Sequence, residues 1–186
     1  MRLLLTLHDR SCYLLSQGLE GLIEIEKGSA GCPGLARLEP TDTEAVGRLF
    51  HRVSPESLYR RFFSPISRPD HFISSLLRTD SLEREAVAAV EGGEIVGVAQ
   101  YSRRPGAPEA ELAILVADDW QRQGIGTRMI AALAHTAAGH GVKAFAVDVQ
   151  GDNYGVHRLL RRVAPGLRLV FSGGVGEGAF AIGEDA

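Results

Sequence analysis

The chain has 186 residues, 45% hydrophobic and 23% charged, a composition typical of one globular domain with a substantial core. A formal net charge of −3 and a pI near 6.1 exclude the strong positive field that binds nucleic acid. Cys12 and Cys32 have no metal or redox spacing, and residues 8–10 interrupt the first apolar run before it reaches the length of a signal sequence. No run approaches the length of a membrane span. We therefore expect a reduced, cytoplasmic protein without membrane or nucleic-acid partners.

Residues 1–34 are the least informative part of the chain. LIEIE (22–26) alternates like a strand, and GSAGCPG (28–34) is typical of a loop. We interpret residues 1–34 as an N-terminal extension that could add a strand or a hairpin. The main domain is then expected over 35–186.

The first third of this domain predicts a short strand followed by helices. LARLEP (35–40) is the strand, and Thr41 with Glu44 forms a candidate capping box. The helix that follows has Val46, Leu49, Phe50 and Val53 at helical spacing. Ser54 and Pro55 are typical of the N-cap and first turn of a second helix. Apolar residues over 73–77 indicate a third.

The rest of the domain alternates strands and helices in a different order. EAVAAV (85–90) and IVGVAQY (95–101) predict a hairpin, and EAELAILV (109–116) predicts the next strand. A helix ending at Gly139 or Gly141, a strand at 144–149, a helix at 156–163 and a closing hairpin (167–172 and 178–182) follow. This order indicates an α/β (α+β) fold with a mixed sheet and helices on both faces.

The strand at 109–116 passes into a helix through VADDWQRQGIGTRMI (116–130). A helix N-terminus carries backbone N–H groups without intrahelical partners and a partial positive charge. Gly124 and Gly126 remove side chains where a ligand would meet the backbone, and they permit positive φ. The turn could therefore hold phosphate oxygens, with Arg122 adding a charged contact. The alternative is a tight turn that uses glycine only for its geometry.

Two well-known phosphate-binding motifs do not fit this turn. No lysine precedes Thr127, as a P-loop requires, and Met129 stands where a dinucleotide-binding fingerprint has its third glycine. The wider pattern, Gln121-Arg122-Gln123-Gly124-Ile125-Gly126 after ELAILV, resembles the acetyl-CoA signature (Gln/Arg)-x-x-Gly-x-(Gly/Ala) of the GNAT acetyltransferase superfamily. SPESLYRRFF (54–63) and the turn are most similar to the bacterial protein-lysine acetyltransferases of that superfamily.

This resemblance covers about 35–183 and implies a mostly antiparallel twisted sheet with a splayed central strand pair. It implies acetyl-CoA as cosubstrate, with the pyrophosphate on backbone N–H groups of residues 122 to 127. The pantetheine arm would pair with the strand segment Ile114, Leu115 and Val116, which splays from 144–149. Asn153 stands where the family often has a residue that contacts the coenzyme, although it could simply cap the next helix. The implied cofactor-binding set is Ile114, Leu115, Val116, Gln121, Arg122, Gln123, Gly124, Ile125, Gly126, Thr127 and Asn153.

Acyl transfer to an amine needs a base, because a lysine ammonium with a pKa near 10.4 is almost fully protonated at neutral pH. Glu109 and Glu111 are two residues apart on one strand and point to the same face. The resemblance favours Glu111 as the base, directly or through water, although an ordinary exposed glutamate is the alternative. A backbone N–H near Val116 would stabilise the oxyanion.

One departure from the family concerns the general acid. Many members have a tyrosine in the helix that follows the asparagine, whereas Leu160 and Arg161 stand near that place here, and Tyr154 lies too early. The general acid is therefore unassigned. The histidines show no metal-binding spacing, so we expect no metal.

Two functions follow as alternatives. The first is an N-acetyltransferase with a primary amine as acceptor, a protein lysine or a small molecule. Glu109, Glu111 and Asp148 would form an acidic lip that suits a cationic amine. The second is a non-catalytic acyl-CoA-binding or sensing module, which the missing tyrosine and the unexplained N-terminus suggest. The sequence does not decide between a monomer and a homodimer.

Overall fold

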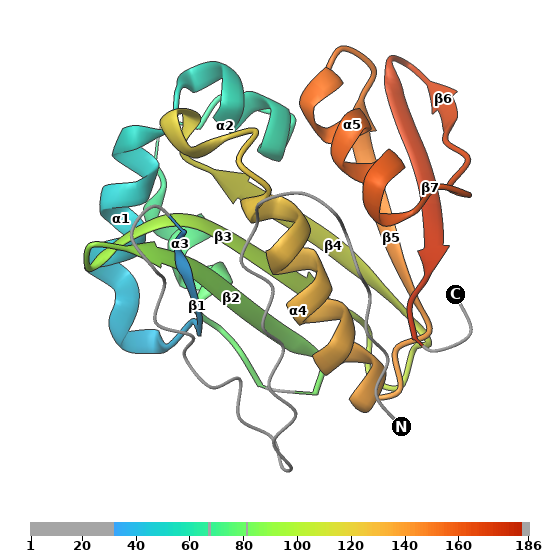
Figure 1. Ribbon diagram of the computed structural model, residues 1–186, viewed down its shortest axis with the longest axis horizontal. Coiled ribbons are helices and arrows are strands. Elements are labelled where there is room, and N and C mark those ends of the chain that lie inside the picture. The colour runs from blue at the N-terminus through green and yellow to red at the C-terminus, as the bar shows by residue number, and fades with distance from the viewer. Residues whose placement is uncertain (1–31, 67, 81, 184–186) are drawn as a thin grey trace.

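The computed structural model describes residues 32–66, 68–80 and 82–183. These residues form a seven-stranded sheet in the order β1-β2-β3-β4-β5-β7-β6 (Figure 1). The strand expected at 22–26 lies outside the described residues, as does all of the proposed extension except its last three positions.

Every neighbouring pair in this sheet is antiparallel except β4 and β5, which are parallel. The predicted mixed, mostly antiparallel sheet is therefore confirmed. The strands are β1 (Gly34–Arg37), β2 (Arg84–Glu91), β3 (Glu94–Ser102), β4 (Glu109–Val116), β5 (Ala144–Gln150), β6 (Val170–Ser172) and β7 (Val175–Ala181).

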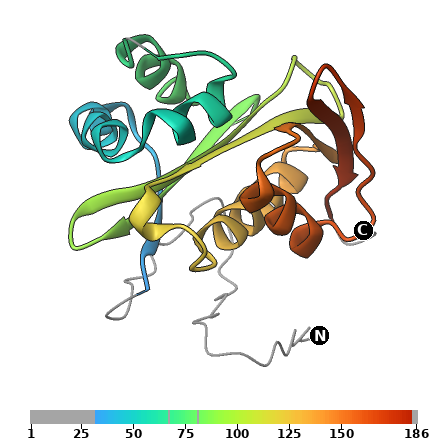
Figure 2. The same ribbon diagram turned by 90° about the horizontal axis from the view of Figure 1, so that it is seen from above.

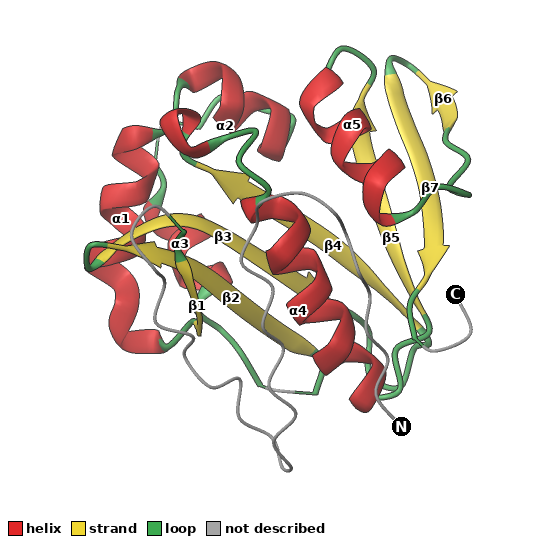
Figure 3. Ribbon diagram, in the orientation of Figure 1, coloured by secondary structure: helices red, strands yellow, loops and turns green. Residues whose placement is uncertain are grey.

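Helices cover both faces of the sheet, as predicted. Figure 2 shows α1, α2 and α3 on one face and α4 and α5 on the other, and Figure 3 distinguishes helices from strands by colour. Their bounds are α1 (Thr43–Arg52), α2 (Pro55–Phe62), α3 (Asp70–Leu76), α4 (Ile125–Gly139) and α5 (Tyr154–Val163), with two 3-10 turns, η1 (Pro40–Asp42) and η2 (Asp118–Trp120).

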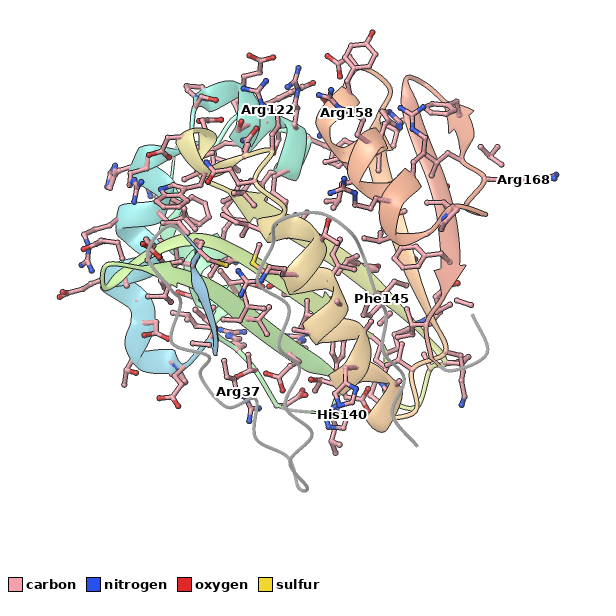
Figure 4. The ribbon with its side chains drawn as sticks, in the orientation of Figure 1. Arg37, Arg122, His140, Phe145, Arg158 and Arg168 are labelled. Atoms are coloured by element: carbon pink, nitrogen blue, oxygen red, sulfur yellow. The ribbon has the colours of Figure 1, made fainter. Side chains whose placement is uncertain are left out.

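The described core has three parts, one beneath each group of helices. Val46, Leu49 and their neighbours pack under α1–α3, and Met129 and Leu133 lie in the part under α4. A smaller part lies between α5 and the outer strands. Phe145 of β5 is fully buried in the α4 part, and its ring centre lies 6.0 Å from those of Tyr101 and Phe180 (Figure 4). Phe145 therefore joins the outer strands to the rest of the sheet.

Both hairpins turn on a pair of glycines. Gly92 and Gly93 have φ values of 59° and 82°, and Gly173 and Gly174 have values of 58° and 85°. Two residues with positive φ make the tight turn that matches the twist of paired strands. In the second hairpin the first strand begins at Val170 rather than at 167, and the second begins at Val175 rather than at 178, since the turn starts the pairing at Ser172 and Val175. Residues 167–169 are consequently outside the strand.

One predicted helix cap is confirmed and another is wrong, and α5 begins at Tyr154, two residues before the predicted start. The Ser54 side chain accepts from the Ser57 backbone N–H at 3.2 Å and caps α2, as expected. The Thr41–Glu44 capping box is wrong. Asp42 instead accepts from the Glu39 backbone N–H at 2.8 Å, because Pro40 begins a 3-10 turn ahead of α1.

Candidate functional site

The parallel strands β4 and β5 pair over only three residues each. Glu109–Glu111 pair with Ala144–Ala146, and beyond these the strands separate, so the splay expected here is confirmed. The separation continues toward the carboxyl ends of both strands, where ligands bind in open α/β sheets. A site is thus expected where β4 leads into α4.

The register against β3 determines which backbone groups of β4 face this gap. The Ala117 N–H donates to the Val96 carbonyl at 2.9 Å. Because antiparallel pairing alternates, the backbone groups of residues 115 and 117 point to β3, and those of Ile114 and Val116 point away from it. The Gln121 side chain donates to the Val116 carbonyl at 3.1 Å. The N–H groups of Ile114 and Val116 therefore face the space that β5 has left.

A cleft of about 1060 Å³ occupies this space. Its volume is at the upper end of the range for small-molecule sites. The walls come from α2 and α3, from β4 and β5, from the start of α4 and from α5. The cleft includes every residue of the predicted set except Gln123, and it brings Glu109, Glu111 and Asp148 to the same site.

The turn before α4 combines two kinds of backbone geometry. Arg122 and Gly124 have φ values of 63° and 81°, so the chain reverses through left-handed positions. The first hydrogen bond of the helix runs from Arg128 N–H to the Gly124 carbonyl at 3.2 Å. The N–H groups of Ile125, Gly126 and Thr127 therefore have no intrahelical acceptor and form an anion-binding end.

Gly126 does not use a positive φ, contrary to the sequence-based expectation, because it lies inside α4. A Cβ at this position would lie 3.1 Å from the Ile114 Cδ1 and 3.1 Å from the Leu159 Cδ2. The glycine is therefore required by the close approach of α4 to β4 and α5, at the wall of the cleft.

Asp118 connects this turn to α2. Its carboxylate accepts from the Ser54 backbone N–H at 2.6 Å, from the Ser57 hydroxyl and from the Gln121 amide at 3.0 Å. Desolvation by burial raises the pKa of Asp118, but the hydrogen bonds from Ser57, Ser54 and Gln121 together outweigh it, so the pKa is lowered. The carboxylate thus fastens the N-terminus of α2 to the turn.

The side chains of the predicted coenzyme set have different surroundings. Gln121 and Gln123 use their amides within the turn, Gln123 donating to the Asp119 carbonyl at 2.9 Å. Leu115 and Ile125 have buried side chains in the core. Arg122 forms no ion pair or side-chain hydrogen bond with the described residues. Figure 4 shows Arg122 and Arg158 on the two sides of the upper end of the cleft.

Asn153 caps α5 through its side-chain oxygen, which accepts from the Val156 N–H at 3.2 Å. The capping role considered for it is therefore present. Asn153 also lines the cleft, and its amide NH₂ is a donor that the cap does not use. Capping and ligand contact are compatible at this residue.

The carboxylates of the cleft lie on the α1–α3 face of the sheet. Leu115 belongs to the core beneath α1–α3. Glu111 and Glu109 are four and six residues before it on β4, so their side chains point to the same face of the sheet. On β5, Val147 and Val149 pack toward α5, so Asp148 points to the opposite face. All three carboxylates are exposed. An approaching cation therefore meets them from this face.

The sequence patterns did not identify Arg61 of α2 as a site residue. Arg61 lines the cleft, and its guanidinium carbon lies 4.7 Å from the centre of the Phe62 ring. Desolvation by burial lowers its pKa to about 10, so it stays cationic at neutral pH. Arg60 pairs with Glu56 at 2.7 Å, whereas Arg61 has no ion pair among the described residues.

The described lining of the cleft contains no tyrosine. Tyr154 is 72% exposed at the start of α5, and Leu160 is buried. The general acid therefore stays unassigned. Within the described residues, no group of three or more potential ligands could hold a metal ion, and none of the helices has the length and apolarity to cross a membrane.

Comparisons with known proteins agree with this geometry. The sequence profile of the Acetyltransferase (GNAT) family matches residues 52–164. Acetyltransferase Pat of Mycolicibacterium smegmatis is 32% identical over 127 residues, which make up 67% of this chain and 38% of the relative. The chain thus spans well under half the length of that relative.

Two solved structures extend the comparison to the fold. The GNAT domain of S. lividans PAT has a TM-score of 0.75 at 26% identity and covers 81% of this chain and 90% of its own. YncA, a putative acetyltransferase from Salmonella typhimurium solved with its cofactor acetyl-CoA, has a TM-score of 0.64. At 14% identity, over 81% of this chain and 94% of its own, it shows the shared fold only.

The Asp118 contacts predict a measurable loss of stability. Asp118→Ala should lower the free energy of unfolding by about 1–2 kcal/mol, as the loss of a helix cap does. Asp119→Ala is the matched control, since it removes only an exposed ion pair with Arg52 and should cost about 0–1 kcal/mol. Urea unfolding of both variants measures the difference.

The pH dependence of that loss follows from the lowered pKa of Asp118. A lowered folded-state pKa stabilises the protein above the unfolded value of about 3.9, and the effect disappears as pH falls through the folded value. The difference between the parent and Asp118→Ala should therefore be full at pH 6 and shrink below about pH 4. A difference that grows on acidification would contradict this assignment.

Proposed function

Because the chain belongs to the GNAT acetyltransferase family, we propose that it transfers an acetyl group from acetyl-CoA to a primary amine. The observation that carries this proposal is the separation of β4 from β5 directly beside the free N-terminus of α4. Together these provide donors for a phosphate group and a strand edge for an extended amide-containing arm. Acetyl-CoA supplies the acetyl thioester when it is bound.

The described residues fit this coenzyme in a defined arrangement. The N–H groups of Ile125, Gly126 and Thr127 would donate to the pyrophosphate, and Arg122 and Arg158 would add positive charge on either side. The backbone of Ile114 and Val116 would pair with the amides of the pantetheine arm, as a further strand would. Asn153 would donate through its amide NH₂.

Glu111 is the proposed base of the reaction, with Glu109 as the neighbouring candidate. The amine arrives as an ammonium ion, and a carboxylate, directly or through water, takes its proton before the nitrogen attacks the thioester carbonyl carbon. The Val116 N–H would stabilise the negative charge that develops on the carbonyl oxygen. The carbon–sulfur bond then breaks, and the nitrogen loses its second proton to water to give the amide. The thiolate takes a proton from water, since the described cleft has no tyrosine to donate one.

For the acceptor, we propose a lysine side chain of a protein. The resemblance of SPESLYRRFF and of the turn to bacterial protein-lysine acetyltransferases supports this choice. The exposure of Glu109, Glu111 and Asp148 supports it as well, because a side chain on a large partner can reach carboxylates at the surface. The acidic face would attract the cationic amine.

A non-catalytic acyl-CoA-binding module is the second candidate. The lack of a tyrosine in the described lining of the cleft favours it. Both candidates require coenzyme binding, so binding alone does not separate them. Release of the coenzyme thiol in the presence of an acceptor does.

One prediction of the proposed function concerns the coenzyme site. Gly126→Val should abolish the rise in melting temperature that acetyl-CoA produces, because a branched side chain would push Ile114 and Leu159 into the cleft. Gly139→Val, on the same helix, is the control, since a Cβ there has no neighbour within 4 Å among the described residues. Thermal unfolding with and without acetyl-CoA is the measurement. Equal shifts in the parent and Gly126→Val would exclude this site.

Another prediction concerns the proposed base, Glu111. Glu111→Gln should leave coenzyme affinity nearly unchanged and slow transfer by about 10²–10⁴-fold. The pH–rate profile should also lose its acidic limb. Steady-state kinetics and calorimetry give the two quantities separately. If Glu109→Gln causes the large loss and Glu111→Gln does not, the role belongs to Glu109.

A further prediction concerns the acceptor. The purified chain with acetyl-CoA should release thiol with protein or peptide lysines in a panel that also contains free amino acids, polyamines and aminoglycosides. Rapid turnover on a small amine with none on any peptide or protein lysine would exclude the protein-lysine acceptor and leave the acetyltransferase activity intact. If no acceptor in the panel causes thiol release although acetyl-CoA binds, the non-catalytic module is favoured.

A further inference from the structure

We propose that Arg61 binds a carboxylate group of the acceptor, so that the acceptor carries an anion beside the amine that is acetylated. This inference rests on the proposed acetyltransferase function and specifies its substrate. The carboxylate could be the free carboxylate of an amino acid or an acidic side chain next to the lysine of a protein. Both sources present the same chemistry to a guanidinium.

The position of Arg61 places it with the acceptor. Arg61 belongs to α2, which packs against β4 on the α1–α3 face. Glu109, Glu111 and Asp148 point to that same face of the sheet and line the same cleft. The lining of the cleft is therefore bipolar, with carboxylates on β4 and β5 and a guanidinium on α2. This charge pattern complements a molecule that carries both an ammonium and a carboxylate.

The surroundings of Arg61 leave its charge uncompensated by the protein. Its neighbour Arg60 is paired with Glu56, but Arg61 forms no ion pair or side-chain hydrogen bond with the described residues. It is half-buried, and among the described residues its guanidinium contacts the face of the Phe62 ring. A guanidinium held in place over an aromatic ring keeps its N–H fork available for a bidentate carboxylate.

The phosphates of the coenzyme have other donors. The free N–H groups at the start of α4 and the side chains of Arg122 and Arg158 lie at the end of the cleft between α4 and α5. These helices cover the opposite face of the sheet from α2. Arg61 therefore belongs to a helix on the other face of the sheet from α4 and α5.

Neutral polar side chains also line the cleft. A second pocket, of about 100 Å³, shares Ser75, Gln100 and Ser102 with the large cleft. These neutral side chains can donate hydrogen bonds to a carboxylate. The buried Glu85 also lines this pocket, but its charge is compensated by Arg37 at 2.9 Å. The cleft thus offers neutral hydrogen-bond donors in addition to the Arg61 guanidinium.

The test uses two pairs of acceptors. Within each pair, one member carries a carboxylate and the other carries the uncharged amide in its place. The first pair is Nα-acetyl-lysine and its carboxamide, and the second is a lysine peptide with glutamate or glutamine beside the lysine. Calorimetry in the presence of coenzyme A measures binding, and thiol release from acetyl-CoA measures kcat/KM. The full chain is compared with Arg61→Gln, with Arg61→Lys, and with Arg48→Gln as a control for loss of charge outside the cleft.

In the parent, the charged member of one pair should bind about tenfold more tightly or better, as charged hydrogen bonds allow. The pair that shows this preference identifies the source of the carboxylate. Arg61→Gln should reduce the ratio to about one while coenzyme affinity is unchanged, and Arg61→Lys should retain part of it because a lysine lacks the planar fork. Arg48→Gln should keep the full ratio.

Three results would overturn the proposal. They are no preference in the parent for either pair, a preference that persists in Arg61→Gln, and a loss of coenzyme affinity in Arg61→Gln that affects all acceptors equally. The last would assign Arg61 to a phosphate of the coenzyme. A binding preference for the charged acceptor without any thiol release would support the role of Arg61 and contradict the proposed transfer activity. Failure of the Arg61 proposal is therefore distinguishable from failure of the proposed function.

Discussion

The short pairing between β4 and β5 is the constraint on which the candidate site depends. Parallel strands normally satisfy each other's backbone groups along their length, but here the ladder ends after Glu111 and Ala146. Beyond that point, backbone donors of β4 face open space, and the first turn of α4 adds further donors at the end of the same strand. Phe145, buried where the strands still touch, keeps the two halves of the sheet together.

The geometry of the cleft is maintained by contacts that cross it or border it. Asp118 links the turn before α4 to α2, so the helix that carries Arg61 is positioned by the same residue that holds the proposed phosphate-binding turn. Gly126 allows α4 to approach both β4 and α5. The two ends of the proposed site, one for the coenzyme and one for the acceptor, therefore share a framework although they lie on opposite faces of the sheet.

Much of the fold could be predicted from local patterns. The hairpin around Gly92 and Gly93, the strand ending at Val116 and the helix capped by Ser54 all depend on residues near one another in sequence. The errors were also local. The first helix was given the wrong cap because a 3-10 turn begins at Pro40, and the loop of the last hairpin was predicted too long because Gly173 and Gly174 form a two-residue turn. The residues near the turn were identified as a candidate coenzyme site from their spacing and from a family resemblance, and their role there stays a proposal.

The sequence by itself determined the order of the elements, the strand-to-helix turn and the family to which the chain belongs, because hydrophobic period, turn residues and motif spacing are local properties. Only the tertiary structure decided which side chains share the cleft. Arg61 lies about fifty residues from Glu111 in the chain, but packing brings both to the lining of one cleft. Likewise, Gly126 was expected to need an unusual backbone angle, whereas the neighbouring Ile114 and Leu159 are what require it. Such contacts arise from the packing of distant segments, which no local pattern encodes.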